Sequence, residues 1–301
     1  MILTFLFLIL TYYILTQSEL SLYYAFHGFT LWYSKMIPSL LPFMILSGIL
    51  VRMDLSKQFA GIVHPLLKRL YGCSKNVSYG IMIGFLCGFP MGARTSAELL
   101  KNGRISQREG AFLLAFCNNI GPVYFCSFVL PLLGLHRTVP YLFGMYGIPL
   151  LYGMVLRRTA FRDLKDPALQ SDADQMEKHT EGRHSLLGAV DESIQASLHS
   201  ILMLCGYMIF FNLLNILPHF WLPALHDYIA PILEITGGLS MLGDKRPFYS
   251  LCILAFGGLS CIAQTNSMIA DSGLSLKQYL IHKTVLTQIT VFYYILCFLL
   301  V

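Results

Sequence analysis

Charged side chains are scarce in this sequence. Only 12% of its 301 residues are Asp, Glu, Lys or Arg, whereas 55% are apolar, and the mean hydropathy is +0.62. Soluble globular proteins carry about 25% charged residues, so this composition excludes a soluble globular enzyme. The net charge of +5 comes from basic residues scattered between apolar runs, without a continuous basic stripe. We therefore predict no nucleic-acid partner.

Motifs for metal, nucleotide and nucleophile chemistry are also lacking. The eight cysteines include no CxxC pair, and the histidines show no HExxH spacing. We therefore predict no metal site and no cofactor. There is no rhomboid-type G-x-S with a suitably placed histidine, which argues against an intramembrane enzyme. No Walker motif is present either, so any driving force for transport would come from a gradient, a partner or dilution.

Long apolar runs are what the sequence has instead. A bilayer span needs about 20 mostly apolar residues, so the chain has room for six to eight crossings. Barrel alternation is absent, and helices otherwise satisfy the backbone in lipid, which predicts an all-α polytopic integral membrane protein. The first run lacks a basic n-region and a small-residue cleavage site, which favours a retained span over a signal peptide. The runs cover residues 2–16, 37–51, 79–93, 111–133, 138–156, 198–217, 248–263 and 285–301.

A polar stretch divides the chain in two. Residues 157–184 hold six basic and six acidic side chains with no apolar stripe, which predicts a solvated linker. Arg157 and Arg158 at its start favour the cytoplasmic side. The predicted organisation is therefore an N-terminal span with an interfacial segment (1–36), a first repeat (37–156), the linker, and a second repeat (185–301). Two further segments, 54–70 and 220–236, have the mixed composition of helices in the membrane interface.

An internal repeat is visible when the chain is shifted by 170 residues. Residues 84–103 then align with 254–273, and Gly88 meets Gly258. Each copy has an apolar run, a glycine-rich break, small polar residues and a short helix ending at glycine. Such breaks survive in a membrane only inside protein or beside water, and two in matching halves indicate a transporter site. We predict broken or re-entrant helical hairpins at Gly88, Pro90, Gly92 and Gly258. A small-xxx-small helix contact through the first-copy glycines is the alternative.

A second polar pair follows each copy. Asn118 and Asn119 precede Gly121 and Pro122, and this proline removes a donor and favours an unwound segment. At an offset of 169 residues, the counterpart of the asparagine pair is Thr287–Gln288. These two residues are equally compatible with ordinary hydrogen bonds between neighbouring helices.

Arg94 is the strongest candidate ligand. A guanidinium near the bilayer centre costs about 2.5–3.5 kcal/mol, so a retained one usually faces a cavity, a counter-charge or a ligand. Glu98 lies four residues on, and a purely structural pair with it is the alternative. Helix N-termini near Arg94 would favour a small polar anion. The predicted anion site consists of Arg94, Thr95, Ser96, Asn118, Asn119, Gln264, Thr265, Asn266 and Ser267.

Two acidic residues lie in apolar surroundings. Glu98 is the counter-charge just described, and Glu234 is flanked by apolar residues and glycines. Glu234 has two interpretations: it couples a cation or proton to transport, or it caps a bent helix.

Residues 84–122 resemble the nucleoside-recognition or Gate domain family, and within it a branch of sporulation integral membrane proteins of spore-forming Firmicutes. The matching elements are a G-[FY]-P-x-G-A core at 88–93, a K-x-G-x-I-S turn at 101–106, and a break at 119–122. A weaker second copy is matched through 233–238 and 264–266. The likeness extends over about residues 37–290.

This resemblance implies two Gate-type repeats and relatedness to concentrative nucleoside transporters, whose substrate lies between helical hairpins. For the sporulation branch it implies movement of dipicolinate, a small aromatic dicarboxylate, towards the forespore. The expected function is a permease for a small anionic or nucleoside-like solute in the cell membrane or the membrane around the forespore. Expected partners besides lipid are a second copy or other sporulation membrane proteins. The alternative is a non-transporting component for spore cortex or coat assembly.

Overall fold

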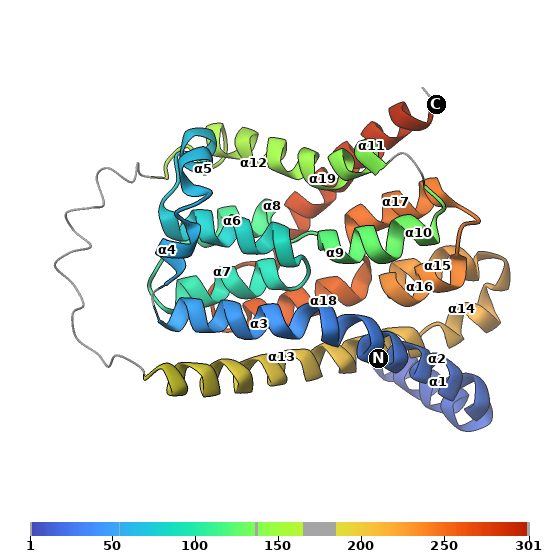
Figure 1. Cartoon of the computed structure of the whole chain (residues 1–301). Helices are drawn as coiled ribbons and strands as arrows, with labels where there is room; N and C mark the ends of the chain where they lie inside the picture. Colours follow the sequence, from blue (N-terminus) through green and yellow to red (C-terminus); the bar gives the residue numbers. More distant parts are fainter. Residues whose placement is uncertain (1, 54, 136–137, 165–184, 300–301) are drawn as a thin grey trace.

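The protein is all-α, as predicted. The computed structural model describes residues 2–53, 55–135, 138–164 and 185–299, and these ranges contain helices and no strand (Figure 1). Five helical stretches are long and apolar enough to cross a membrane, which makes this a multi-pass membrane protein. They are Ser18–Arg52, Thr138–Arg158, Leu186–Trp221, Pro247–Ile269 and Leu276–Leu299.

Several of the apolar runs in the sequence do not form separate, uninterrupted crossings. The run at 37–51 is the second part of one 35-residue stretch that begins at Ser18. The runs at 79–93 and 111–133 are interrupted by helix breaks, and the run at 2–16 forms a helix of only 15 residues. Apolar length therefore overestimates the number of uninterrupted spans.

The first part of the chain is built from short helices. π-helical turns at Trp32–Met36, Phe125–Val129 and Phe143–Gly147 join consecutive segments. The helices are α1 (Ile2–Thr16), α2 (Ser18–Leu31), α3 (Ile37–Arg52), α4 (Ser56–Ala60), α5 (His64–Tyr71), α6 (Lys75–Cys87), α7 (Met91–Lys101), α8 (Gln107–Phe116), α9 (Pro122–Tyr124), α10 (Leu130–Leu132), α11 (Thr138–Leu142) and α12 (Ile148–Arg158).

The second part begins after residues 165–184, a portion of the predicted linker that lies outside the described residues. Its first helix is the longest, with 28 residues, and it runs along one side of the bundle beside α3 (Figure 1). The helices are α13 (Leu186–Leu213), α14 (Ile216–Trp221), α15 (His226–Leu233), α16 (Ile235–Leu242), α17 (Pro247–Phe256), α18 (Gly258–Ile269) and α19 (Leu276–Leu299).

A helical hairpin followed by a broken span occurs twice. In the first part, α6 and α7 pack against each other and reverse at 88–90, after which the next span is unwound at 118–121, between α8 and α9. In the second part, α15 and α16 pack against each other and reverse at Glu234, and the next span is broken at Gly257, between α17 and α18. The order of elements is thus the same in both parts.

Each hairpin tip lies against the broken span of its own part. Gly88 has φ +77°, and a Cβ there would overlap the backbone of Gly121. Gly258 also has φ +77°, and a Cβ there would lie 3.0 Å from the carbonyl oxygen of Pro231. Only glycine combines this backbone conformation with such close approach, so the two glycines fix where tip and break meet.

The sequence alignment of the two copies places a helix break at Gly88 and at Gly258, as the structure does, but only the first of these breaks is a hairpin tip. The first break is confined to 88–90, so Arg94 lies inside α7, and residues 258–264 are helical instead of forming a hairpin tip. The second hairpin is instead built from 226–242, and this includes much of the segment expected in the interface. Thr287 and Gln288 lie in the uninterrupted α19. Small residues occur at both kinds of break, and the alignment could not tell a hairpin from a broken span.

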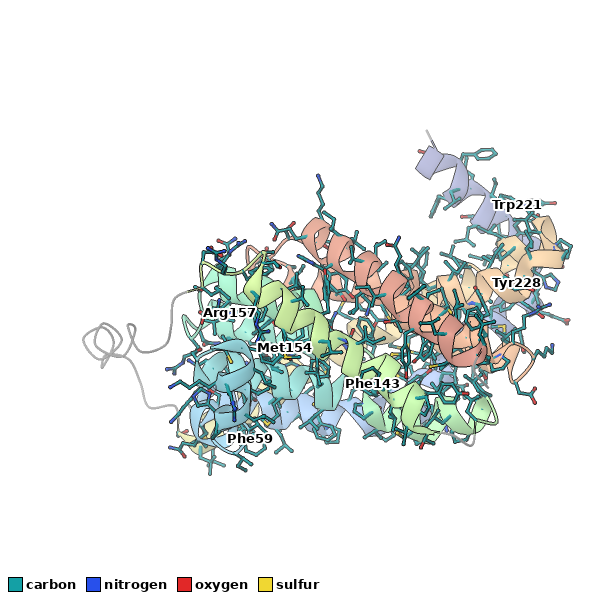
Figure 2. All side chains as sticks on the ribbon, turned by 90° about the horizontal axis from the view of Figure 1, so that it is seen from above. Phe59, Phe143, Met154, Arg157, Trp221 and Tyr228 are labelled. Atoms are coloured by element: carbon teal, nitrogen blue, oxygen red, sulfur yellow. The ribbon has the colours of Figure 1, made fainter. Side chains whose placement is uncertain are left out.

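One end of the bundle is basic. Arg157 at the end of α12 donates to the carbonyl oxygen of Tyr71 at 2.8 Å, and Arg108 pairs with Asp163 at 3.1 Å. This contact lowers the pKa of the Asp163 carboxyl, chiefly through its hydrogen bonds with the guanidinium. The aromatic residues Trp221 and Tyr228 lie at the opposite end (Figure 2). The positive-inside rule predicts that the Arg157 end faces the cytoplasm.

Cysteine labelling tests this orientation. Lys101 and Lys245 are both exposed. Lys101 ends α7, and Lys245 lies in the connection between α16 and α17, at the opposite end of the described bundle (Figure 1). In a variant without the eight native cysteines, Lys101→Cys is expected to react with a membrane-impermeant maleimide from the cytoplasmic side only. Lys245→Cys is expected to react from the other side only. Labelling of both from one side would contradict this topology.

Candidate functional site

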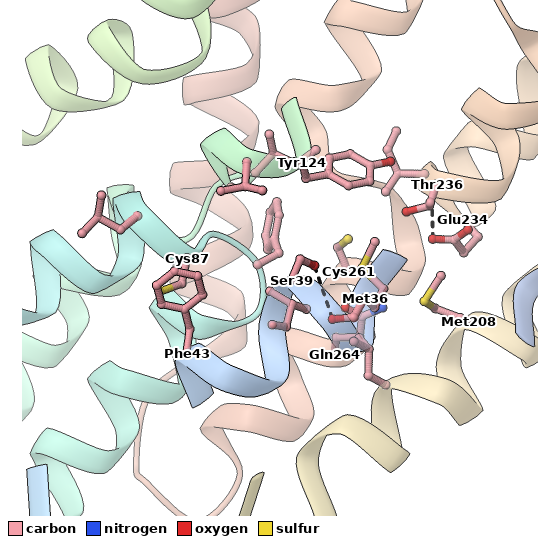
Figure 3. Close-up of a pocket in the computed structure, with 18 residues that line it drawn as sticks. Met36, Ser39, Phe43, Cys87, Tyr124, Met208, Glu234, Thr236, Cys261 and Gln264 are labelled. Carbon is pink, nitrogen blue, oxygen red and sulfur yellow. Dashed lines mark hydrogen bonds between the residues drawn. The ribbon is translucent and has the colours of Figure 1, made fainter. Parts of the chain in front are cut away.

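A central cavity lies between the two hairpin tips (Figure 3). Cys87 and Phe89 contribute from the first tip, and Glu234 and Thr236 from the second. Gln264 of α18 adds a further polar group to a lining that is otherwise largely apolar. The cavity volume is about 60 Å³, whereas an engineered cavity of about 150 Å³ holds one benzene ring. In this conformation the central cavity has room for water but not for an aromatic ring.

Glu234 begins the second helix of its hairpin. Its side chain is buried, and its carboxylate accepts hydrogen bonds from the backbone N–H of Thr236 at 3.1 Å and of Gly237 at 2.6 Å. The side-chain amide of Asn212 donates a third bond at 3.1 Å. The carboxylate thus caps α16 and occupies the positive end of that helix. This geometry matches the helix-capping interpretation of Glu234.

Asn118 joins three segments of the molecule. Its Oδ1 accepts a bond from the backbone N–H of Ala93 at 3.2 Å, and its Nδ2 donates to Thr265 Oγ1 at 2.9 Å. Its backbone oxygen accepts a bond from Lys283 Nζ at 3.3 Å. The first hairpin, the second broken span and α19 are therefore tied together at the unwound segment. An unwound backbone at this depth is possible because protein groups satisfy it.

Lys283 was not among the residues predicted from the sequence. Its side chain is 3% exposed, its Nζ also donates to Asn119 Oδ1 at 3.1 Å, and it lies 4.6 Å from the centre of the Phe89 ring. In the sequence Lys283 stands just before the last apolar run, where a lysine usually marks the end of a membrane span. The spacing of Tyr279, Lys283 and Thr287, four residues apart on one helical face, was the available signal.

Arg94 lines a second cavity, which we call the Arg94 cavity. The guanidinium is buried, and its Nε pairs with Glu98 at 3.1 Å while Nη2 donates to Ser197 at 3.3 Å. Arg94 Nη1 and Glu98 Oε2 are buried without a hydrogen-bond partner among the described residues. The cavity volume is about 220 Å³. Its other lining residues include Ala97, Lys101, His199, Ser200 and Ser267.

The same two helices line both cavities. Along α18, Cys261 and Gln264 line the central cavity and Ser267 lines the Arg94 cavity. Along α13, Leu204 lines the central cavity and Met203 the Arg94 cavity. Successive turns of the same two helices thus line one cavity after the other, with the Arg94 cavity nearer the basic end.

The residues of the predicted anion site do not form one cluster. Asn118, Asn119 and Thr265 meet at the unwound segment, whereas Arg94 and Ser267 line the Arg94 cavity. Gln264 lies in the central cavity and donates to Ser260 at 2.9 Å. Thr95 and Ser96 are buried in α7, where Ser96 bonds to its own helix, and Asn266 is exposed.

Comparisons with known proteins identify one curated relative of particular relevance. The chain is 24% identical over 321 aligned positions to the sporulation integral membrane protein YlbJ of Bacillus subtilis (strain 168), which covers 92% of this chain and 77% of the relative. This similarity confirms the resemblance to sporulation integral membrane proteins and agrees with a multi-pass membrane protein. No family model matches the chain. No solved structure matches it significantly.

Proposed function

We propose that the protein is a carrier for a small organic anion, and that it moves dipicolinate during spore formation. The sporulation part rests on the similarity to YlbJ. The carrier part rests on two hairpin tips and two broken spans that converge on the central cavity. Discontinuous helices of this kind are typical of transporter sites near the bilayer midplane.

The observation that carries the proposal is the incomplete pairing of Arg94. A buried guanidinium is stable in a membrane protein when its charge and its donors are both compensated. Glu98 compensates the charge, yet Arg94 Nη1 has no hydrogen-bond partner among the described residues and belongs to a side chain that lines a cavity. A guanidinium matches a carboxylate through two parallel N–H···O bonds. Nη1 is itself buried, so a carboxylate in the Arg94 cavity would supply what it lacks once the guanidinium turns towards the cavity.

Cavity size indicates how the anion would move. The Arg94 cavity, at about 220 Å³, exceeds the volume that holds one aromatic ring, whereas the central cavity, at about 60 Å³, does not. The cargo would therefore enter from the basic end and contact Arg94 first. Passage would require the hairpin tips to separate and enlarge the central cavity, as in alternating access between two repeats. On this proposal the repeats are residues 37–156 and 185–301.

Uptake into vesicles tests the proposed function. The purified chain is reconstituted in liposomes, and entry of radiolabelled dipicolinate is compared with that in protein-free liposomes. We expect saturable uptake that unlabelled dipicolinate inhibits and uridine does not. Inhibition by uridine would favour a nucleoside as cargo. Uptake equal to that of protein-free liposomes would reject transport and favour a non-transporting role in cortex or coat assembly.

A further inference from the structure

We propose that Lys283 is a second anion-binding side chain, which receives one carboxylate of a dicarboxylate cargo when Phe89 moves off it. The inference rests on the proposed function and specifies the chemistry that the central cavity would recognise. It starts from a charge in the core of the bundle that the described structure leaves without an opposite charge.

The position of Lys283 is unfavourable for a lysine that serves only as a flanking charge. It is the eighth residue of α19, about 10 Å along the helix at 1.5 Å per residue. Lysines near the end of a span usually extend to the interface, but this side chain is 3% exposed and its ammonium bonds inward. None of the ion pairs found among the described residues includes it.

The groups around the ammonium are all neutral. Nζ donates to the backbone oxygen of Asn118 and to Oδ1 of Asn119, and the third contact is the face of the Phe89 ring. An ammonium carries three donors, so two oxygen acceptors leave one donor over the ring. A neutral amide donor would serve two oxygen acceptors equally well. A basic amine is thus the feature that the local structure does not require and that an anion would use, because a nearby anion favours its charged form.

Phe89 separates this charge from the central cavity. Its side chain lines the cavity, whereas Lys283 does not, and the ammonium lies on the ring face at 4.6 Å from the centroid. Phe89 belongs to the first hairpin tip and also approaches the second break, where a Cβ on Gly257 would lie 3.0 Å from the ring. Separation of the tips would therefore expose Lys283 to the cavity in the same movement that enlarges it.

Binding measurements on the detergent-solubilised full chain test this assignment. The probes are pyridine-2,6-dicarboxylate and pyridine-2-carboxylate, and the affinity of each is taken from the concentration dependence of thermal stabilisation. The wild-type protein is expected to bind the dicarboxylate at least about 10-fold more tightly. Lys283→Met is expected to remove most of that preference and Lys283→Arg to keep most of it. Lys277→Met, an exposed change on the same helix, is the matched control.

Phe89→Leu is expected to change dicarboxylate affinity in the opposite direction from Lys283→Met. The contact of the ammonium with the ring must be broken before an anion binds, and such contacts contribute about 0.5–2 kcal/mol. Removing the ring is therefore expected to tighten dicarboxylate binding by about 2- to 30-fold. Phe292→Leu, which changes an exposed aromatic residue of α19 that lines neither cavity, is expected to leave the preference unchanged.

The outcomes separate this inference from the proposed function. An unchanged dicarboxylate preference in Lys283→Met, or no stabilisation of the wild type by either probe, would overturn the assignment of Lys283. If Lys283→Met does not fold, weaker dicarboxylate binding in Phe89→Leu would overturn it instead. Binding that depends on Lys283 but without any vesicle uptake would reject the carrier function and leave the binding site standing.

Discussion

Arg94→Gln is expected to lower the initial rate of dipicolinate uptake by about 30-fold or more at subsaturating dipicolinate and a matched amount of protein in the vesicles. Loss of one member of a buried charged pair with its ligand costs about 2–5 kcal/mol, and every 1.4 kcal/mol is tenfold. Arg94→Lys keeps the charge but loses the planar fork, so uptake should fall here as well. Exposed Lys101 lines the same cavity, and Lys101→Gln should have a much smaller effect.

The structural alternative for Arg94 is a pair with Glu98 alone. The two side chains are 3.1 Å apart, so Arg94→Gln leaves a carboxylate without its partner. If that pair were the whole role of Arg94, combining Arg94→Gln with Glu98→Gln would restore uptake, because no unpaired charge would remain. We expect the double variant to stay as impaired as Arg94→Gln. Full rescue would reassign Arg94 from cargo binding to structure.

Gly88→Ala is expected to destabilise the protein by more than about 3 kcal/mol. The added Cβ would overlap the backbone of Gly121, and backbone cannot move aside as a flexible side chain can. The position also has φ +77° and ψ −160°, a region that essentially only glycine populates and that costs an L-residue about 1–3 kcal/mol. Thermal unfolding of the purified variant should shift down by roughly 10 °C, at about 2–4 °C per kcal/mol.

Gly103→Ala separates the cost of the steric overlap from the cost of the backbone conformation. Gly103 has φ +63°, and nothing lies within 4 Å of a Cβ built there. The loss of stability in Gly103→Ala should reflect the backbone conformation alone. It should be clearly smaller than the loss of stability in Gly88→Ala. Equal losses in the two variants would show that the contact between the first hairpin tip and the unwound segment contributes little.

Local chemistry explains what the sequence could predict. Gly88 and Pro90 interrupt a helix by their own backbone properties, and Pro122 does the same after the two asparagines. These breaks, the helical class and the membrane location therefore follow from short stretches of sequence. The capping of α16 by Glu234 is equally local, since donor and acceptor are two and three residues apart.

Long-range packing explains what it could not. Arg94 contacts Ser197, 103 residues away in the chain, and Lys283 contacts Asn119, 164 residues away. Neither contact leaves a periodic pattern in the sequence. The second hairpin was missed for a related reason. Its reversal is made by Glu234 and lacks the glycine-proline pattern of the first, so only the packing of α15 against α16 reveals it.

Counterflow tests the carrier mechanism most directly, because it needs no knowledge of the coupling ion or energy source. Vesicles are loaded with unlabelled dipicolinate and diluted into a trace of labelled dipicolinate, and the internal label is followed with time. A carrier with a specific site exchanges one molecule for the other, so the account predicts a transient accumulation of label above its external concentration, absent in Arg94→Gln. A rise to equilibrium without accumulation, or the same accumulation in Arg94→Gln, would contradict it.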